Sequence, residues 1–159
     1  MLHLVSDDDL DFINHIRNDE RNISLLNWSS WSPESKEDTL RYINKFSGSY
    51  YVITGDDQSK VGYVHVKNSN LGTGRHFSGL EVGIFIVPDA RGLGYGARAL
   101  AELEKFHQDS FCFVARVVID NTPSLKLFTR SGYYQVGSIP VLSSSELIPT
   151  NLVILAKKI

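Results

Sequence analysis

Three glycines in one short segment have the spacing to bind a phosphate group. Residues 87–97 read Val-Pro-Asp-Ala-Arg-Gly-Leu-Gly-Tyr-Gly-Ala, and they lie between a nearly continuous apolar run and a stretch with apolar residues at helical spacing. Glycine lets the backbone turn tightly and approach a ligand without a side chain in the way. At the start of a helix, unpaired amides and the positive end of the helix dipole favour an anion. The segment therefore predicts a phosphate or pyrophosphate site between a buried strand and a helix.

Two nucleotide-binding loops compete for this segment. The triphosphate loop needs Lys followed by Ser or Thr after its last glycine, where this chain has an Ala-Arg pair, so that interpretation fails. The dinucleotide fingerprint is satisfied better, because Gly92, Gly94 and Ala97 match G-x-G-x-x-A and Asp120 lies at a suitable distance. Against it, residues 88–91 separate the glycines from the strand, and only one strand-helix-strand unit is visible. A dinucleotide-binding protein therefore stays as the weaker alternative.

A second segment, residues 121–133, places Asn before a predicted helix and Gly plus an aromatic residue at its end. Residues 91–96 match R/Q-x-x-G-x-G/A, so the two segments together resemble the GNAT (Gcn5-related) N-acetyltransferases. Residues 17–19, residues 81–86 and Ser124 resemble most the subgroup typified by RimJ and RimL. The resemblance extends over the order of elements in the whole chain. It implies direct transfer of an acetyl group from acetyl-CoA to a primary amine, such as a peptide N-terminus or an amino sugar.

The resemblance also implies where the cofactor lies. The strand that ends near Val87 is expected to splay from the strand that begins near Phe113, with the pantetheine arm in the gap. Backbone groups of Ile86 and Val87 would hold this arm, and the Val87 amide would donate to the thioester oxygen. Asn121 would hydrogen-bond the pantetheine, although Asn also suits the N-terminus of the following helix. The remaining expected cofactor-binding residues are Arg91, Gly92, Leu93, Gly94, Tyr95, Gly96 and Ser124.

Proton transfer needs two further groups. An amine is mostly protonated at neutral pH, so attack on the thioester requires a proton acceptor, and Glu81 on the central strand is the candidate, directly or through water. A carboxylate that only orients substrate or supports the structure is the alternative. Many members protonate the leaving thiolate with a Tyr where this chain has Phe128, and Tyr133, Tyr134 or water could substitute. The missing Tyr also supports a catalytically silent acyl-CoA-binding regulatory module.

The acceptor is an amine on a small molecule or a peptide. Trp28 and Trp31 fall where the family builds one wall of the acceptor pocket, unless both rings only cover the core, and residues 139–150 fall at the other wall. The histidines lie beside no Cys or carboxylate at ligand spacing, so we expect no metal.

Composition limits the remaining possibilities. The chain has 159 residues, 42% of them hydrophobic, which fits one domain over residues 1–159. Its 16 basic and 18 acidic side chains give a net charge of -2, so nucleic acid is not an expected partner. A basic, apolar signal segment and a run of about 20 apolar residues are both absent, so we expect a cytoplasmic protein that does not bind membranes. Either a monomer or a homodimer fits.

The elements that must position these residues follow from periodicity. We expect an α/β domain whose mixed, mostly antiparallel sheet contains one central parallel pair, with about four helices. Helices are expected to begin after Ser6, at Pro33, at Gly94 and at Thr122, and Leu40 should face inward. The expected strands span residues 2–5, 49–54, 60–67, 80–87, 113–119, 133–138 and 151–157.

Overall fold

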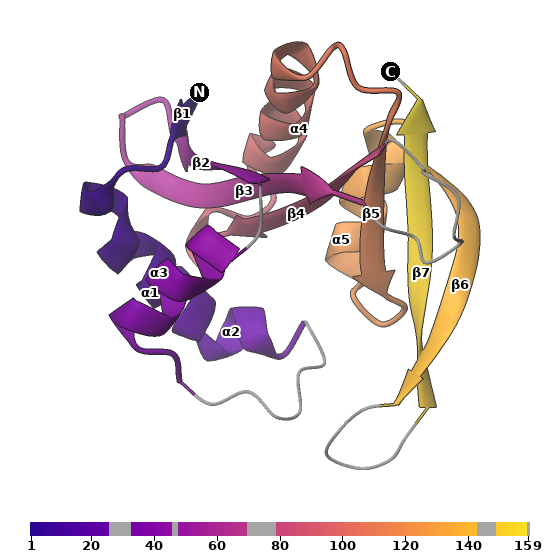
Figure 1. Cartoon of the computed structure of the whole chain (residues 1–159), viewed down its shortest axis with the longest axis horizontal. Helices are drawn as coiled ribbons and strands as arrows, with labels where there is room; N and C mark the ends of the chain where they lie inside the picture. Colours follow the sequence, from indigo (N-terminus) through magenta and orange to yellow (C-terminus); the bar gives the residue numbers. More distant parts are fainter. Residues whose placement is uncertain (26–32, 46–47, 70–78, 143–148, 159) are drawn as a thin grey trace.

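A sheet of seven strands forms the centre of the protein. The computed structural model describes residues 1–25, 33–45, 48–69, 79–142 and 149–158. The strand order is β1-β2-β3-β4-β5-β7-β6 (Figure 1). The β4–β5 pair is parallel, and the other described pairs are antiparallel, which confirms the predicted mixed sheet. The strands are β1 (Leu2–Leu4), β2 (Gly48–Thr54), β3 (Lys60–Asn68), β4 (Gly79–Ile86), β5 (Cys112–Val118), β6 (Tyr134–Leu142) and β7 (Pro149–Lys158).

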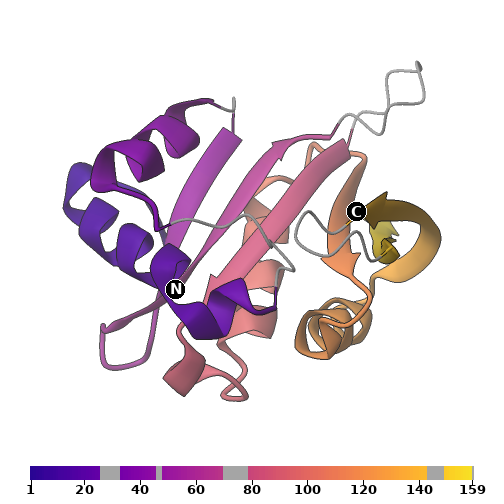
Figure 2. The same ribbon diagram turned by 90° about the horizontal axis from the view of Figure 1, so that it is seen from below.

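Helices cover both faces of this sheet. Figure 2 shows α1 and α3 on one side of strands β2 to β4 and α4 on the other. The α-helices are α1 (Leu10–Asn18), α2 (Glu20–Ile23), α3 (Lys36–Lys45), α4 (Tyr95–Phe106) and α5 (Thr122–Arg130), and two 3-10 turns are η1 (Asp7–Asp9) and η2 (Pro88–Ala90). Four of these helices are of substantial length, as predicted.

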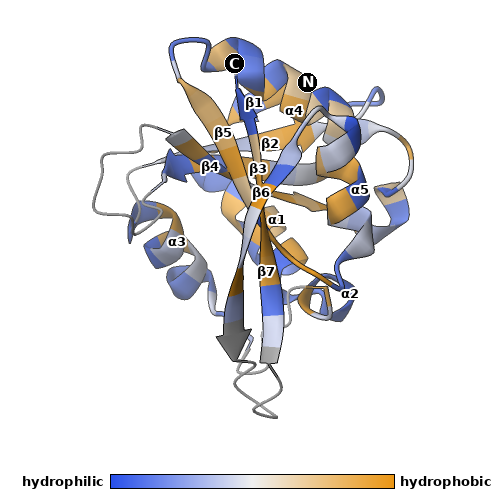
Figure 3. Cartoon of the chain, turned by 90° about the vertical axis from the view of Figure 1, so that its right-hand side faces the viewer, coloured by the Kyte–Doolittle hydropathy of each residue, from blue (hydrophilic) through white to orange (hydrophobic). Residues whose placement is uncertain are grey.

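Two hydrophobic cores hold the helices to the sheet. The larger one lies under α4 and α5 and includes Leu100, Leu103 and Phe113, and the smaller one packs Ile13 and Ile16 of α1 against aromatic residues of β2 and β3. Figure 3 shows β5 in mostly hydrophobic colours and α3 in mostly hydrophilic ones. Helix α3 is thus a surface helix, whereas β5 is mostly buried, with Arg116 as its exposed residue.

Several boundaries differ from those predicted. Helix α2 was not predicted. Helix α3 begins at Lys36 rather than Pro33, because Ser35 and Asp38 form reciprocal hydrogen bonds that cap it there. Leu40, expected to face inward, is 38% exposed. Strands β6 and β7 extend into the expected loop at residues 139–150, since their antiparallel pairing continues past Pro140, which an edge strand tolerates.

The fork between β4 and β5 creates space for a site. The two strands pair at Gly79↔Cys112, Leu80↔Phe113 and Glu81↔Val114. Beyond these three positions β4 continues to Ile86 and β5 to Val118 without pairing to each other. Figures 1 and 2 show the strands diverging from the paired end. The expected splay is confirmed, and it leaves one edge of a central strand open.

Candidate active site

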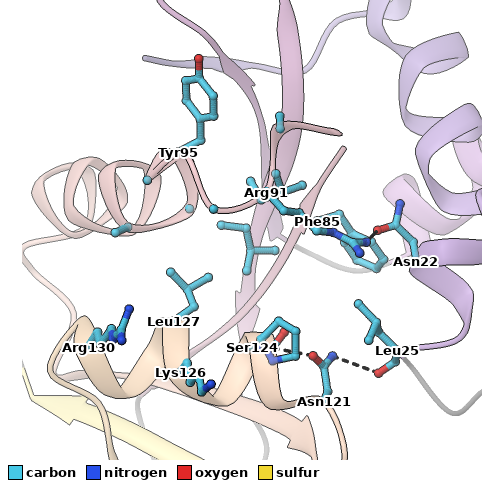
Figure 4. Close-up of a pocket in the computed structure, with 18 residues that line it drawn as sticks. Asn22, Leu25, Phe85, Arg91, Tyr95, Asn121, Ser124, Lys126, Leu127 and Arg130 are labelled. Carbon is cyan, nitrogen blue, oxygen red and sulfur yellow. Dashed lines mark hydrogen bonds between the residues drawn. The ribbon is translucent and has the colours of Figure 1, made fainter. Parts of the chain in front are cut away.

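A cavity of about 400 Å³ lies between the outer part of β4, the glycine loop and α5 (Figure 4). Of the predicted cofactor residues, Ile86, Arg91, Gly92, Gly94, Tyr95, Gly96, Asn121 and Ser124 line it. Val87, Leu93 and Glu81 are not among its lining residues, and Leu93 is 63% exposed. Two segments separated by about 30 residues of sequence thus meet around one cavity, as the resemblance implied.

The glycine loop has the backbone shape of an anion site. Gly92 has a φ of 77° and Gly94 a φ of 82°, values that side-chain-bearing residues rarely adopt. A Cβ atom at either position would meet no atom within 4 Å, so the space beside them is open. The first hydrogen bond of α4 runs from Arg98 N to Gly94 O (3.1 Å), so the three preceding helical amides have no acceptor within the helix. These amides and the helix dipole favour an anion here.

Gly96, the third glycine of the loop, allows close packing between two helices. A Cβ at Gly96 would lie 3.0 Å from Leu127 Cδ2 and 3.2 Å from Leu127 Cδ1. Gly96 therefore lets α4 pack closely against α5, whereas Gly92 and Gly94 shape the loop itself.

Arg91 ties the loop to α2. Its guanidinium donates to Asn22 Oδ1 and to the backbone oxygen of Arg21 (3.3 Å). Asn22 is buried and itself donates to Ile16 O (2.8 Å). The recorded partners of Arg91 are a side-chain amide and a carbonyl oxygen rather than the carboxylate of a surface salt bridge. Figure 4 shows this contact across the mouth of the cavity.

Asn121 lies on the opposite wall and is 7% exposed. Its Oδ1 accepts from Ser124 N (3.1 Å), which caps α5, and its Nδ2 donates to Leu25 O (2.9 Å). Capping, the alternative left open by the sequence, therefore takes place. The second N–H of Nδ2 and a second lone pair of Oδ1 remain to contact a ligand, and contact with pantetheine stays a prediction.

The backbone donor on β4 needs a correction. The Val87 amide, predicted to donate to the thioester oxygen, donates to Val61 O of β3 (2.9 Å). In an antiparallel pair, alternate residues direct their N–H and C=O groups to opposite sides of the strand. Ile84 and Ile86, an odd number of positions from Val87, therefore direct these groups toward the open side of the fork, and both line the cavity. The available donors lie on these residues.

Comparison with known proteins identifies the family. A model of the acetyltransferase (GNAT) domain matches residues 1–134. The chain belongs to the GNAT acetyltransferase family. The family inferred from the two motifs is confirmed, and the chain is accordingly an acyltransferase. No curated protein sequence matches it.

Solved structures of the same fold extend over the chain. The ribosomal-protein-alanine N-acetyltransferase from Brucella melitensis is 20% identical, with a TM-score of 0.83 over 100% of this chain and 99% of that one. A phosphinothricin acetyltransferase from Sinorhizobium meliloti, in complex with AcCoA, is 17% identical, with a TM-score of 0.82 over 100% and 88%. Spermidine N-acetyltransferase from Vibrio cholerae, in complex with CoA and spermine, is 16% identical, with a TM-score of 0.79 over 99% and 94%. At these identities the likeness establishes the GNAT fold.

Glu81, the predicted base of this GNAT protein, takes part in two ion pairs. It lies at the last paired position of β4, where Oε1 is 3.4 Å from Lys67 Nζ and Oε2 accepts from the Arg116 guanidinium. These contacts are typical of a carboxylate that also orients neighbouring groups. Its role as base stays a prediction.

The groups considered for thiolate protonation lie elsewhere. Phe128 is 3% exposed and packs edge-to-face on Tyr133, with ring centroids 5.0 Å apart. The Tyr133 hydroxyl is buried without a hydrogen-bond partner among the described residues, and burial raises its pKa. Tyr134 is 59% exposed. Neither tyrosine lines the cavity, which leaves water as the remaining candidate of those named.

A buried polar network behind the cavity was missed by sequence analysis. Arg17 is 2% exposed, and its guanidinium donates to both oxygens of Glu34 (2.7 Å each) and to the Tyr63 hydroxyl (3.2 Å). The Tyr63 ring stacks on Phe85, which lines the cavity, with centroids 4.8 Å apart. The sequence offered only a motif match at residues 17–19, because the partners of Arg17 are distant in the chain.

Some predictions fall outside the described residues. Trp28 and Trp31 lie there, as does part of the loop expected to form the other acceptor wall. In the parts of the chain that are described, no group of three His, Cys, Asp or Glu side chains could hold a metal ion. Within the same parts, no helix has the length and apolar character to cross a bilayer.

Proposed function

We propose that this GNAT protein binds acetyl-CoA in the cavity at the fork and transfers the acetyl group directly to a primary amine of a small molecule or a peptide. One observation carries the proposal: a single cavity joins the unpaired amides at the start of α4 to the open edge of β4. The first feature suits a pyrophosphate and the second suits an arm that contains amide groups. Acetyl-CoA carries both, because its pantetheine arm, with two amide groups, is joined directly to its pyrophosphate.

The residues at the fork support direct transfer. A backbone N–H of Ile84 or Ile86 would hydrogen-bond the thioester oxygen and stabilise the negative charge that develops there. The amine nitrogen attacks the carbonyl carbon, the carbon–sulfur bond breaks, and the thiolate leaves and takes a proton from water. Cys112 is 4% exposed and burial raises the pKa of its thiol, which argues against an acetylated cysteine intermediate.

Glu81 remains the proposed acceptor of the amine proton. Because Lys67 and Arg116 contact its two oxygens, transfer through a water molecule fits better than direct contact with the amine. Replacement of Glu81 by Gln should lower turnover most at low pH. A pH profile parallel to that of the wild type would assign Glu81 to structure instead.

A silent acyl-CoA-binding module is the second candidate function. The observation that favours it is the burial of Phe128 and Tyr133 away from the cavity, which leaves no side-chain acid identified for the thiolate. This candidate requires the same cofactor site but no acetyl transfer. Binding and turnover therefore have to be measured separately.

The test combines calorimetry with mass spectrometry. CoA should bind more tightly than NAD, and acetyl-CoA should acetylate at least one amine in a panel of peptides with N-terminal alanine, amino sugars, polyamines, phosphinothricin and free amino acids. Tight CoA binding without transfer to any member would favour the silent module. Tighter binding of NAD than of CoA would contradict both candidates.

A further inference from the structure

We propose that Arg116 binds an oxyanion of the acceptor, so that the preferred substrate is an amine that also carries a carboxylate or a similar acidic group. The proposal rests on the acetyl transfer proposed above and names the chemical class of its acceptor. It concerns the face of the fork that lies opposite α4 and α5.

The position of Arg116 places its side chain beside Glu81, the proposed acceptor of the amine proton. Arg116 lies two residues beyond Val114, the last residue of β5 that pairs with β4. Side chains two apart on a strand share a face, so Arg116 extends from the open arm of the fork on the same face as Glu81. Its hydrogen bond to Glu81 agrees with this placement. In this strand it is the exposed residue between buried Ala115 and Val117.

Arg116 has more hydrogen-bond donors than Glu81 can accept from. Glu81 accepts from it through Oε2, while Oε1 lies 3.4 Å from Lys67 Nζ. Arg116 has five N–H donors, and its partner among the described residues is Glu81 alone. A guanidinium of this kind matches the two oxygens of a carboxylate or a phosphinate. An anion of the acceptor would therefore accept hydrogen bonds from the remaining donors of this side chain.

Arg17, on the same face of the sheet, is an arginine whose charge and hydrogen-bond donors are matched by protein groups. Its guanidinium is 2% exposed and is enclosed by Glu34 and Tyr63, so no ligand can reach it. The Arg116 side chain is 35% exposed. The difference in access, within one face of one sheet, selects Arg116 as the arginine that can contact a substrate.

His65 forms an uncharged part of the same face. It lies opposite Gly83, the second β4 residue past the paired end, and a Cβ at Gly83 would come within 2.3 Å of its ring. Burial lowers the pKa of His65 to about 3, so the imidazole is neutral near pH 7. Its Nδ1 is buried with no hydrogen-bond partner in the described part of the chain. His65 is 5% exposed, so it adds no charge beneath this face, and selection for an anion is left to Arg116.

The adjacent carboxylate and guanidinium complement a zwitterion. An amine near Glu81 with its oxyanion near Arg116 matches both charges, as an amino acid would. A polyamine would place a second cation beside Arg116, where repulsion opposes binding. Free amino acids and related amino acids with a phosphorus oxyanion are therefore favoured over polyamines.

Matched ligands test this inference in the protein saturated with CoA. The probes are the common amino acids, each as the free acid and as its primary amide, with affinity measured by calorimetry and acetyl transfer by mass spectrometry. At least one free acid should bind about 10-fold or more tightly than its amide, in keeping with a charge-assisted bidentate contact. An amide loses the charge but keeps the amine, which it also deprotonates more readily, so chemistry alone would favour the amide.

Variants then assign the preference to Arg116. Arg116→Gln should abolish the preference for the acid and leave CoA affinity unchanged, which also reports on folding, and Arg116→Lys should retain part of the preference. Arg41→Gln, at an exposed arginine of α3, should change neither. Equal binding of acids and amides by the wild type, or equal loss of both in Arg116→Gln, would overturn the inference.

The two proposals can fail separately. A preference for acids that depends on Arg116, without acetyl transfer to any of these probes or to any amine of the panel under Proposed function, would support the oxyanion site and remove the proposed acetyl transfer. Acetyl transfer to amides as efficient as to acids would support the transfer and remove the oxyanion site.

Discussion

The two sides of the β4–β5 fork are built in different ways. On the proposed cofactor side, the site consists mainly of backbone: the positive φ angles of Gly92 and Gly94 and the free amides at the start of α4. On the proposed acceptor side, it consists of side chains that meet from distant parts of the chain, such as Arg17 with Glu34 and Glu81 with Arg116. A backbone site is specified by a short segment, whereas a side-chain site depends on the whole fold.

The largest effect is expected from Gly94→Val. The substitution forces a β-branched residue into a positive φ and places its side chain in the open space beside the loop, so CoA affinity should fall at least about 100-fold by calorimetry. Gly132→Val is the control, because Gly132 also has a positive φ of 88° but is not a lining residue of the cavity. It should show similar backbone strain with unchanged affinity. Equal affinity losses in both variants would attribute the loss to destabilisation.

Glu34→Gln should lower the stability of the protein and leave its affinity for CoA unchanged. It leaves the buried Arg17 guanidinium without its carboxylate partner, which should lower the free energy of unfolding in urea by about 3 kcal/mol. CoA affinity should stay within about 2-fold of the wild type, because the amides of the glycine loop are untouched.

Arg41→Gln is the matched control for this loss. It removes an exposed ion pair with Asp38 and should cost less than about 1 kcal/mol. A loss of CoA affinity in Glu34→Gln that parallels its loss of stability would show that the two sides are not independent.

A smaller, pH-dependent change in the free energy of unfolding is expected from Asp9, at the start of α1. Burial alone would raise the pKa of this carboxyl, but hydrogen bonds from Lys60 and from Ser6 lower it from 3.8 to about 2. A carboxyl whose pKa is lower in the folded state than in the unfolded state stabilises the fold at pH values above its unfolded pKa. This contribution is lost as pH falls from about 4 to 2. Asp9→Asn should therefore cost about 2 kcal/mol at pH 7, and the difference from the wild type should shrink over that interval.

Urea unfolding at several pH values measures this dependence. Asp8→Asn, at an exposed carboxylate of the same 3-10 turn, should change stability by no more than about 0.5 kcal/mol at pH 7. A difference between Asp9→Asn and the wild type that persists unchanged at pH 2 would contradict the ion-pair explanation.

The difference between the two sides also decides what the sequence could predict. Apolar periodicity predicted the central strand and the order of the elements, because both follow from local patterns. The glycine loop and Asn121 were predicted for the same reason. The fork was predicted from the resemblance to the GNAT family. Helix α2 was missed because four residues are too few to show a helical period.

Other features depended on register or on long-range contacts. The thioester donor was assigned to Val87, one residue away from Ile86, because only the observed pairing with Val61 shows which side of β4 each amide faces. Arg17 gave only the motif match at residues 17–19 and Arg116 gave no local signal, since their partners lie 17 and 35 residues away. Such contacts become visible only when the strands and helices are placed in space.

The hydrogen bond from Asn121 to Leu25 has a consequence for ligand affinity. The Leu25 carbonyl is held within reach of this donor by the chain itself, so it acts as an intramolecular competitor at high effective concentration. A ligand that takes the N–H now donated to Leu25 exchanges one hydrogen bond for another, and its net gain is the difference between the two, below the roughly 1 kcal/mol of a new bond. A ligand that uses the second N–H of Nδ2 leaves the Leu25 bond intact. The affinity for an occupant that displaces the Leu25 carbonyl is therefore set partly by how firmly the protein retains it.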